Sequence, residues 1–208
     1  MKTLQIHRGV FSTQEIQDLI DYYRDQPYVK EKMLDGGLQY KNKNNDYNID
    51  TSVPYKIINP KLKNILGEHS MQFGTYLESH KPFSLHVDNN TTFQNKGMYQ
   101  HLSNAHKNLS VLIPLSEHEL FSTVFFDYSI ELFDKNCSLP RVLDQPQSCE
   151  SLLSHLSLEW QEQIQWIPVD GIFHWRLGDL AVWHRDQLHC ASNFLSSGLT
   201  KQAVTIFL

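Results

Sequence analysis

Short apolar runs, rich in β-branched and aromatic residues, divide the second half of the chain and constrain its fold more than any other feature. Polar turns separate these runs, and each run has the length of a β-strand. The runs are residues 83–87, 109–115, 122–127, 172–176, 180–184 and 201–208. Many short strands separated by turns predict an antiparallel, barrel-like double sheet.

Helical spacing marks the first part of the chain instead. Ser12 and Glu15 have the spacing of a capping box, and apolar residues follow at helical intervals, so we expect a helix over 13–25. Pro60 suits the first turn of a helix, because its missing N–H would have no partner there, and it predicts a second helix over 60–78. These helices are expected to brace the double sheet.

Two further stretches depart from this pattern. Residues 35–52 are rich in Asn, Lys, Gly and Asp, which predicts a surface loop or, alternatively, a flap over a site. Residues 128–170 form an insertion, with a helix expected near 149–164. We expect a single domain of 208 residues that is mainly β, with a helical support region over 1–80 and the β core over 81–208.

The composition narrows the range of partners and compartments. Lys and Arg number 18 against 23 Asp and Glu, with no basic block, so no nucleic-acid partner is expected. The three cysteines have no C-x-x-C spacing and are too few for a disulfide framework, which fits a reducing compartment. No segment has the apolar length of a signal peptide or a membrane span. We therefore expect a cytoplasmic protein without a membrane partner.

A histidine and a carboxylate form a candidate metal site. His86 and Asp88 lie two positions apart on a predicted strand and so project to the same face. The pair suits Zn, Fe, Mn or Ni, although two common residues at this spacing are a weak signal alone. His189 would complete a 2-His-1-carboxylate triad, which leaves three coordination positions open. Rival third ligands, which lack a strand context, are His101, His106 and His118.

Several motifs follow one another in an order that is similar to one enzyme superfamily. The matching segments are Gly9-Val-Phe-Ser-Thr13, Phe83-Ser-Leu-His-Val-Asp88, Asn108-Leu-Ser-Val-Leu-Ile-Pro-Leu-Ser116, Gly178-Asp-Leu-Ala-Val-Trp183 and Gly198-Leu-Thr-Lys201. Together with His189 they resemble the Fe(II)/2-oxoglutarate-dependent dioxygenases, and the prolyl-4-hydroxylase-like branch in particular. The resemblance excludes residues 28–56 and the insertion.

The resemblance implies a fold, a metal and a cosubstrate. The fold would have a double-stranded β-helix core, of the jelly-roll and cupin-like kind. The reaction would use Fe(II), 2-oxoglutarate and O2, and His86, Asp88 and His189 would be the metal ligands at the catalytic centre. Related halogenases carry a small residue in place of the carboxylate, so the presence of Asp88 favours hydroxylation or another oxidation.

The cosubstrate also needs a cation and hydroxyl donors. When 2-oxoglutarate chelates iron through its 1-carboxylate and 2-oxo group, its 5-carboxylate calls for a cation at the far end of the barrel. Lys201 opens the last predicted strand and is the candidate, and Thr205 lies four residues further along the same face. The family places a tyrosine hydroxyl on the cosubstrate near Tyr76, and Tyr99 is an alternative donor.

Four residues are candidates for substrate binding, each with a more ordinary alternative. Trp183 could line the substrate pocket or belong to the core. Arg176 and Arg185 could bind a substrate carboxylate or form surface salt bridges. Asn193 could position the substrate or cap a turn. The expected specificity elements are residues 35–56, 89–107 and 128–170.

The sequence therefore predicts an oxygenase that hydroxylates an unactivated C–H bond and releases succinate and CO2. The polar loop at 89–107 favours a small polar or amino-acid-like substrate over a protein. A peptidyl or prolyl hydroxylase, a cupin-like metal-binding protein and an inactive barrel that acts as an interaction module are the alternatives. The sequence leaves the oligomeric state open, with a homodimer as one option.

Overall fold

The computed structural model describes residues 4–34, 37–45, 52–69, 73–83, 88, 109–129, 168–185, 187–194 and 198–208. These residues form two helices and ten strands. The elements are β1 Gln5–His7, α1 Thr13–Arg24, β2 Lys30–Leu34, β3 Gly37–Asn45, α2 Val53–Leu66, β4 Phe73–Ser79, β5 Leu109–Pro114, β6 Ser122–Ser129, β7 Val169–His174, β8 Leu180–His184, β9 Gln187–Ala191 and β10 Lys201–Phe207.

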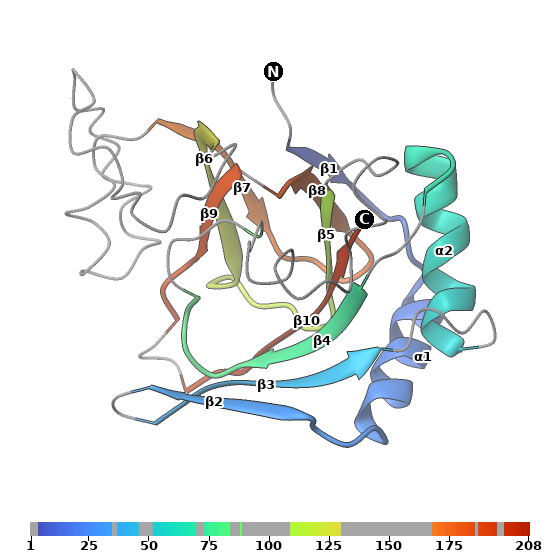
Figure 1. Cartoon of the computed structure of the whole chain (residues 1–208), viewed down its shortest axis with the longest axis horizontal. Coiled ribbons are helices and arrows are strands. Elements are labelled where there is room, and N and C mark those ends of the chain that lie inside the picture. The colour runs from blue at the N-terminus through green and yellow to red at the C-terminus, as the bar shows by residue number, and fades with distance from the viewer. Residues whose placement is uncertain are drawn as a thin grey trace, which may run out of the picture.

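The strands form two antiparallel sheets. The large sheet has the order β1-β8-β5-β10-β4-β3-β2, and the small sheet has the order β7-β6-β9. Figure 1 shows α1 and α2 against one side of the large sheet, with the small sheet on its other side. The large sheet therefore separates two layers, and each of its faces must be apolar.

Successive side chains of the central strands point alternately into the core beneath the helices and the core between the sheets. On β8, Leu180 and Val182 belong to the core beneath the helices, whereas Ala181 and Trp183 belong to the core between the sheets. Because successive side chains of a strand point to opposite faces, each strand contributes to both cores. Ala203 on β10 likewise lies in the core between the sheets.

The first helix follows the sequence prediction closely. The Ser12 hydroxyl accepts from the backbone N–H of Glu15, and the Glu15 carboxylate accepts from the backbone N–H of Ser12. Ile16, Leu19 and Tyr23 are buried on the inner face of α1. The predicted capping box and amphipathic helix are therefore confirmed. No helix in the described part of the chain is long and apolar enough to cross a bilayer.

The second helix differs from its prediction. It begins after Ser52, whose hydroxyl accepts from the backbone N–H of Tyr55, and the proline in its first turn is Pro54 rather than Pro60. Pro60 lies inside the helix, which ends before Gly67. Strand β4 contains residues 73–78, which were expected to end this helix, so the prediction of a helix over 60–78 is wrong for these residues.

Within the polar stretch at 35–52, residues 37–45 form strand β3 rather than the expected surface loop. Strand β3 pairs with β2 on one side and with β4 on the other, and so extends the large sheet. The ladder to β4 satisfies the backbone of this polar strand, and a polar composition is tolerated near the edge of a sheet. The region 1–80 is therefore not a purely helical support, because β1 to β4 belong to the large sheet.

The strands of the second half agree with the apolar runs. Strands β5, β6, β7, β8 and β10 occupy the predicted segments within a few residues at each end. Strand β9 was missed, and His189 lies on it rather than after it. Residues 84–87 of the predicted run at 83–87 lie outside the described residues, and so does the helix expected near 149–164.

The β7–β8 connection packs closely against the segment that precedes α1. Gly178 has φ 88°, and a Cβ at this position would lie 2.6 Å from the carbonyl oxygen of Phe11. The backbone N–H of Phe11 donates to the Gly178 oxygen at 3.0 Å. The buried carboxylate of Asp179 accepts from the backbone N–H of Gly9 and pairs with Arg8. The Gly178-Asp179 motif therefore attaches the N-terminal segment to the sandwich.

Gly178→Ala should lower the free energy of unfolding by at least about 2 kcal/mol, because it adds both backbone strain and a backbone clash. Gly198→Ala is the matched control. Gly198 also has a positive φ, of 65°, but a Cβ there would meet nothing within 4 Å. The control should lose only about 1 kcal/mol. Urea unfolding measures both, and equal losses would show that the contact with Phe11 does not matter.

Candidate functional site

The structure brings Asp88 and His189 together, although they are distant in sequence. The Oδ1 atom of Asp88 lies 3.7 Å from Nε2 of His189 on β9. Two backbone hydrogen bonds fix this approach: Asp88 donates to the Arg185 oxygen at 2.8 Å, and Ala191 donates to the Phe83 oxygen at 3.1 Å. Phe83 therefore lies beside β9, and Asp88 lies beside the connection between β8 and β9.

The orientation of the His189 ring leaves a basic nitrogen directed at the carboxylate. Nδ1 lies 2.9 Å from the backbone oxygen of Gln187, which can only accept, so Nδ1 carries the proton. In the neutral ring Nε2 then presents a lone pair toward Asp88. Phe125 stacks on the ring with centroids 5.6 Å apart and holds this orientation. Either a proton on Nε2, which makes the contact an ion pair, or a metal ion shared by Nε2 and Oδ1 would satisfy both groups.

This donor pair fits a first-row transition metal. A backbone hydrogen bond on one nitrogen of a histidine and a metal on the other is the usual arrangement at such sites. The two described ligands would leave coordination positions for a third protein ligand and for other groups. No set of three candidate ligands occurs in the part of the chain that is described. His86 lies outside the described residues, and so do His101 and His106, two of the three histidines considered as rival third ligands.

A buried lysine lies elsewhere between the two sheets. The side chain of Lys201 is almost fully buried and donates to the backbone oxygen of Ser122 at 2.6 Å. Its Nζ lies 3.8 Å from the centroid of the Trp175 ring. Burial lowers the pKa of Lys201 well below its usual value. One carbonyl and an aromatic face compensate only part of the cost of removing an ammonium from water.

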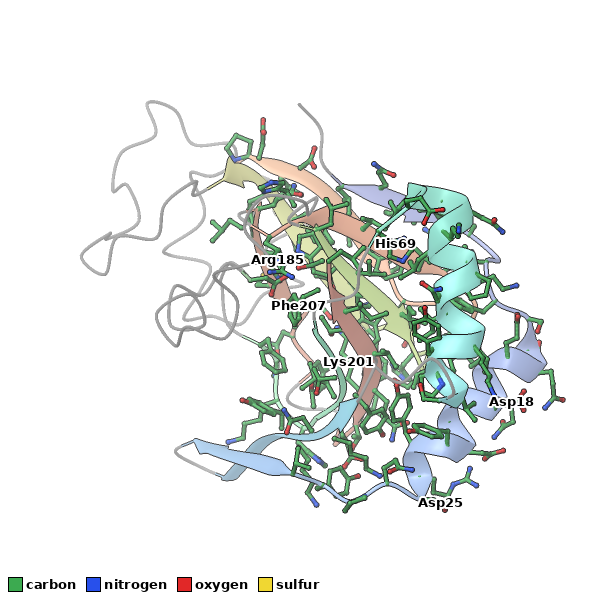
Figure 2. All side chains as sticks on the ribbon, turned by 45° about the vertical axis from the view of Figure 1, so that its right-hand side comes forward. Asp18, Asp25, His69, Arg185, Lys201 and Phe207 are labelled. Carbon is green, nitrogen blue, oxygen red and sulfur yellow. The ribbon has the colours of Figure 1, made fainter. Side chains whose placement is uncertain are left out.

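No carboxylate in the described part of the chain pairs with Lys201. Cys190 is the nearby acid, but burial raises the pKa of its thiol to about 12, so it is neutral near pH 7. Figure 2 shows Lys201 inside the molecule, whereas Asp18 and Asp25 of the α1 region lie on the outside. Within the described part of the chain, the charge of Lys201 therefore has no acidic partner to offset its burial.

Strand β6 relates the lysine to the metal-ligand pair. Phe125 of β6 lies directly opposite His189, and the Ser122 oxygen that binds Lys201 is three residues away on the same strand. Three residues of strand span about 10 Å. A short dicarboxylate that chelated a metal at His189 and Asp88 could place its distal carboxylate near Lys201. The arrangement therefore suits a ligand with a metal-binding end and an anionic end.

The hydroxyl donors expected beside the lysine have different positions. Thr205 is buried and shares the face of β10 that carries Lys201. Tyr76 is opposite Val204 and stacks on Tyr23 of α1, with ring centroids 5.0 Å apart. It therefore faces the helices, away from Lys201, which corrects the expectation that Tyr76 contacts 2-oxoglutarate. Tyr99 lies outside the described residues.

The four substrate candidates are dispersed. Trp183 is buried, and its Nε1 donates to Oδ2 of Asp88 at 3.1 Å, so it supports a ligand of the candidate metal site. Arg176 is exposed in the β7–β8 connection. Arg185 lies over the Phe207 ring, with its guanidinium carbon 5.1 Å from the centroid, and Figure 2 shows these two residues near one another. Asn193 is partly buried just after β9.

Sequence reasoning missed several residues of the site. Ser110 on β5 donates to Oδ2 of Asp88 at 2.6 Å, and Trp175 faces Lys201. Tyr40 on β3 lies opposite Ser79 in the row that includes Lys201. Alternation along 109–115 would have assigned Ser110 to a buried face, and a buried serine calls for a partner. Tyr40 carried no such signal, because the polar sequence around it predicts a loop rather than a strand.

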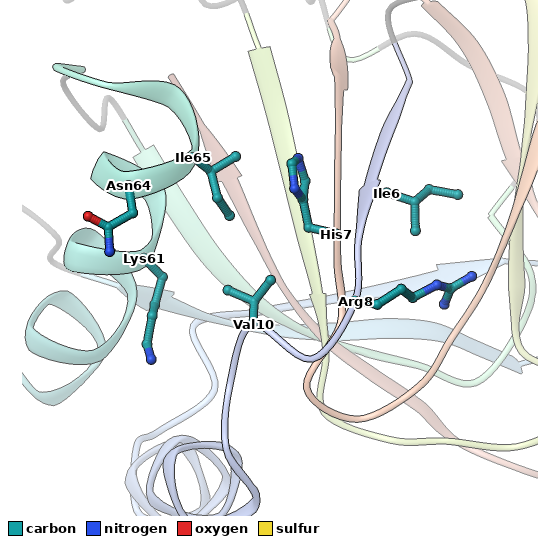
Figure 3. Close-up of a pocket in the computed structure, with 7 residues that line it drawn as sticks. All are labelled: Ile6, His7, Arg8, Val10, Lys61, Asn64 and Ile65. Atoms are coloured by element: carbon teal, nitrogen blue, oxygen red, sulfur yellow. The ribbon is translucent and has the colours of Figure 1, made fainter.

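A groove elsewhere in the molecule has no comparable chemistry. It runs between the N-terminal segment and α2 and is lined by Ile6, His7, Arg8, Val10, Lys61, Asn64 and Ile65. In Figure 3 Arg8 and Lys61 point in different directions rather than toward a common point. Arg8 pairs with Asp179, and Lys61 pairs with Glu15 at 3.0 Å. The groove therefore presents no converging set of uncompensated groups among the described residues.

No protein-family model and no curated protein matches the sequence. Solved structures do match. The non-heme α-ketoglutarate-dependent epimerase SnoN from nogalamycin biosynthesis has a TM-score of 0.63 and 14% identity, over 99% of this chain and 77% of that one. The non-heme α-ketoglutarate-dependent carbocyclase SnoK, from the same biosynthesis, has a TM-score of 0.59 and 12% identity, over 99% of this chain and 79% of that one. HygX from Streptomyces hygroscopicus, with nickel and 2-oxoglutarate bound, has a TM-score of 0.58 and 11% identity, over 99% of this chain and 82% of that one.

These similarities establish the fold. The chain has the jelly-roll, or double-stranded β-helix, architecture that these oxygenases share, so the predicted fold class is confirmed. Sequence identities of 11–14% show a shared fold, and a shared fold does not by itself specify the chemistry of a site.

Replacement of Lys201 by methionine should stabilise the ligand-free protein. The substitution removes a buried ammonium that has no acidic partner in the described part of the chain and keeps the volume of the side chain. We expect the free energy of unfolding to rise by about 1–3 kcal/mol near neutral pH. Urea unfolding of the two proteins without metal or dicarboxylate measures it. A less stable variant would mean that Lys201 is already compensated.

The same comparison predicts a pH dependence. An unfolded lysine has a pKa of about 10.4, whereas burial lowers the pKa of Lys201 in the folded protein. Between the two values the unfolded state binds more protons, so wild-type stability rises with pH relative to Lys201→Met. The advantage of the variant should be greatest below the folded pKa and should shrink as the pH approaches about 10. Unfolding curves measured across this range test the prediction, and a constant difference would contradict it.

Proposed function

We propose that the protein is a non-haem Fe(II)- and 2-oxoglutarate-dependent oxygenase. One observation carries this proposal. The buried Lys201 lacks an acidic partner among the described residues and lies between the same two sheets as the Asp88–His189 pair. A metal-binding protein without an anionic cosubstrate would have no evident use for that lysine. The shared fold with enzymes whose structures contain iron or nickel and 2-oxoglutarate supports the assignment.

The overall reaction would consume the substrate, O2 and 2-oxoglutarate, and it would yield the hydroxylated product, succinate and CO2. One oxygen atom enters the product and the other enters succinate. Bound Fe(II) would supply the activation of oxygen. His86, Asp88 and His189 would hold it, with His86 taken from its place in the motif because it lies outside the described residues.

The residues of this chain would bind and orient the cosubstrate. Lys201 would pair with its 5-carboxylate, and Thr205 shares the same face of β10. The rings of Trp175, Phe121 and Phe194 surround the ammonium, with Nζ between 3.8 and 5.9 Å from their centroids. These rings exclude water, so the pair between Lys201 and the carboxylate forms in a weakly screening environment. The cost of burying the lysine is then offset when the cosubstrate binds.

We favour a small polar molecule as the substrate. SnoN has been solved with nogalamycin RO, and HygX with hygromycin B, which are both small molecules. The prolyl-4-hydroxylase-like motifs make a peptidyl substrate the second candidate, and a hydroxylated C–H bond is our proposal for either class. We also propose that the chain acts as one domain in the cytoplasm, on the basis of its sparse cysteines.

Anaerobic addition of Fe(II) and then 2-oxoglutarate should produce a visible charge-transfer band in the wild-type protein. Asp88→Ala and His189→Ala should abolish the band, because each removes a proposed metal ligand. Lys201→Met should still bind metal but should weaken 2-oxoglutarate binding about 100-fold, since it removes one partner of a buried ion pair. Succinate release under oxygen, screened over amino acids and peptides, then identifies the substrate class.

Lys43→Met provides the matched control. Lys43 is a second buried lysine of the large sheet, and its Nζ lies 5.5 Å from the ring centroid of Tyr76. It bonds to the last carbonyls of α1, so its loss should reduce stability and leave 2-oxoglutarate affinity unchanged. If both lysine variants bound 2-oxoglutarate equally weakly, the loss of affinity would be due to lower stability and not to the loss of a specific contact. A wild-type protein that bound neither Fe(II) nor 2-oxoglutarate would refute the proposal.

A further inference from the structure

We infer that Ser110 and Trp183 act as positioning residues that restrict Asp88 to one metal-binding oxygen. The inference rests on the proposed function, because it concerns how this chain presents a carboxylate to the metal. Ser110 Oγ lies 2.6 Å from Oδ2 of Asp88, and Trp183 Nε1 lies 3.1 Å from the same atom. The other oxygen, Oδ1, is the one that faces Nε2 of His189 at 3.7 Å.

The two donors therefore make the two oxygens of the Asp88 carboxylate inequivalent. Hydrogen bonds to a charged acceptor are stronger than those between neutral groups, and Oδ2 accepts two of them. A metal that used Oδ2 would have to displace both donors. Oδ1 is directed toward the histidine and is the oxygen that can share a cation with it. Ligation through Oδ1 alone conserves a coordination position that a chelating carboxylate would occupy.

Both donors are held rigidly. Ser110 on β5 is directly opposite Trp183 on β8, and neither side chain is exposed beyond 1%. The Trp183 ring also contacts the other ligand, since its centroid lies 5.2 Å from that of His189, and it packs against Phe125 at 5.1 Å. A single indole thus fixes one ligand through its N–H and touches the second through its ring.

Metal binding tests the inference without any need for turnover. The variants are Ser110→Ala and Trp183→Phe, each of which removes one donor while keeping an apolar group of similar shape. Co(II) alone is titrated into the metal-free proteins, with affinity and the visible absorption spectrum as readouts. We expect each variant to bind Co(II) about tenfold more weakly, since outer hydrogen-bond partners of ligands contribute at least this much. The spectrum should change as well, because the released Oδ2 can enter the coordination sphere.

Ser116→Ala is the matched control for a lost serine hydroxyl. Ser116 lies just after β5 and exchanges hydrogen bonds with the backbone of Gln202, away from Asp88. It should lose stability comparable to that lost by Ser110→Ala and keep wild-type affinity and spectrum. Because the donors lie on two strands, a folding defect in one variant leaves the other as a valid test.

The outcomes separate the two proposals. If Asp88→Ala abolishes Co(II) binding but both donor variants bind with wild-type affinity and spectrum, the positioning role is refuted and the proposed function stands. If the wild-type protein binds no Co(II), or binds it equally well without Asp88, the proposed function and the positioning role are both refuted. Weaker binding with an altered spectrum in either donor variant, but not in Ser116→Ala, supports the inference.

Discussion

The two-residue period of strand β10 is the constraint on which both the core and the site depend. This strand pairs with β4 and β5 at the centre of the large sheet. Val204 and Ile206 pack beneath the helices, whereas Ala203 belongs to the core between the sheets. Lys201 shares the face of Ala203 by alternation. A shift of one residue in the register would move the lysine beneath the helices and expose apolar side chains to the site.

Two buried lysines on the same sheet differ in how their surroundings compensate the charge. Lys43 lies at the C-terminal end of α1, where it donates to the Tyr23 and Arg24 carbonyls, and Asp25 and Glu78 counteract the lowering of its pKa by burial. Lys201 has one carbonyl, aromatic rings and a neutral thiol. The charge of Lys43 is therefore compensated within the fold, whereas Lys201 has no acidic partner among the described residues.

Patterns that act within a few residues were predictable from the sequence. The capping box placed α1, and the apolar runs placed the strands around Asp179 and Lys201. Predictions failed where neighbours distant in sequence decide the outcome. The polar strand β3 is defined by its ladder to β4, and the direction of Tyr76 is set by the register with β10. The motif order predicted that Asp88 and His189 belong to one site. It carried no information on the hydrogen-bond donors to Asp88, because Ser110 and Trp183 lie on strands distant from Asp88 in sequence.

The location of the site between the sheets links its chemistry to the stability of the fold. Lys201 belongs to the large sheet, but its ammonium bonds to Ser122 of the small sheet. Trp183 of the large sheet likewise packs against His189 of the small one. Each contact orients a group for ligand binding and also holds the two sheets together. If a cosubstrate bridged the metal and Lys201 as proposed, it would add a further connection of this kind, and its binding would then also stabilise the interface between the two sheets.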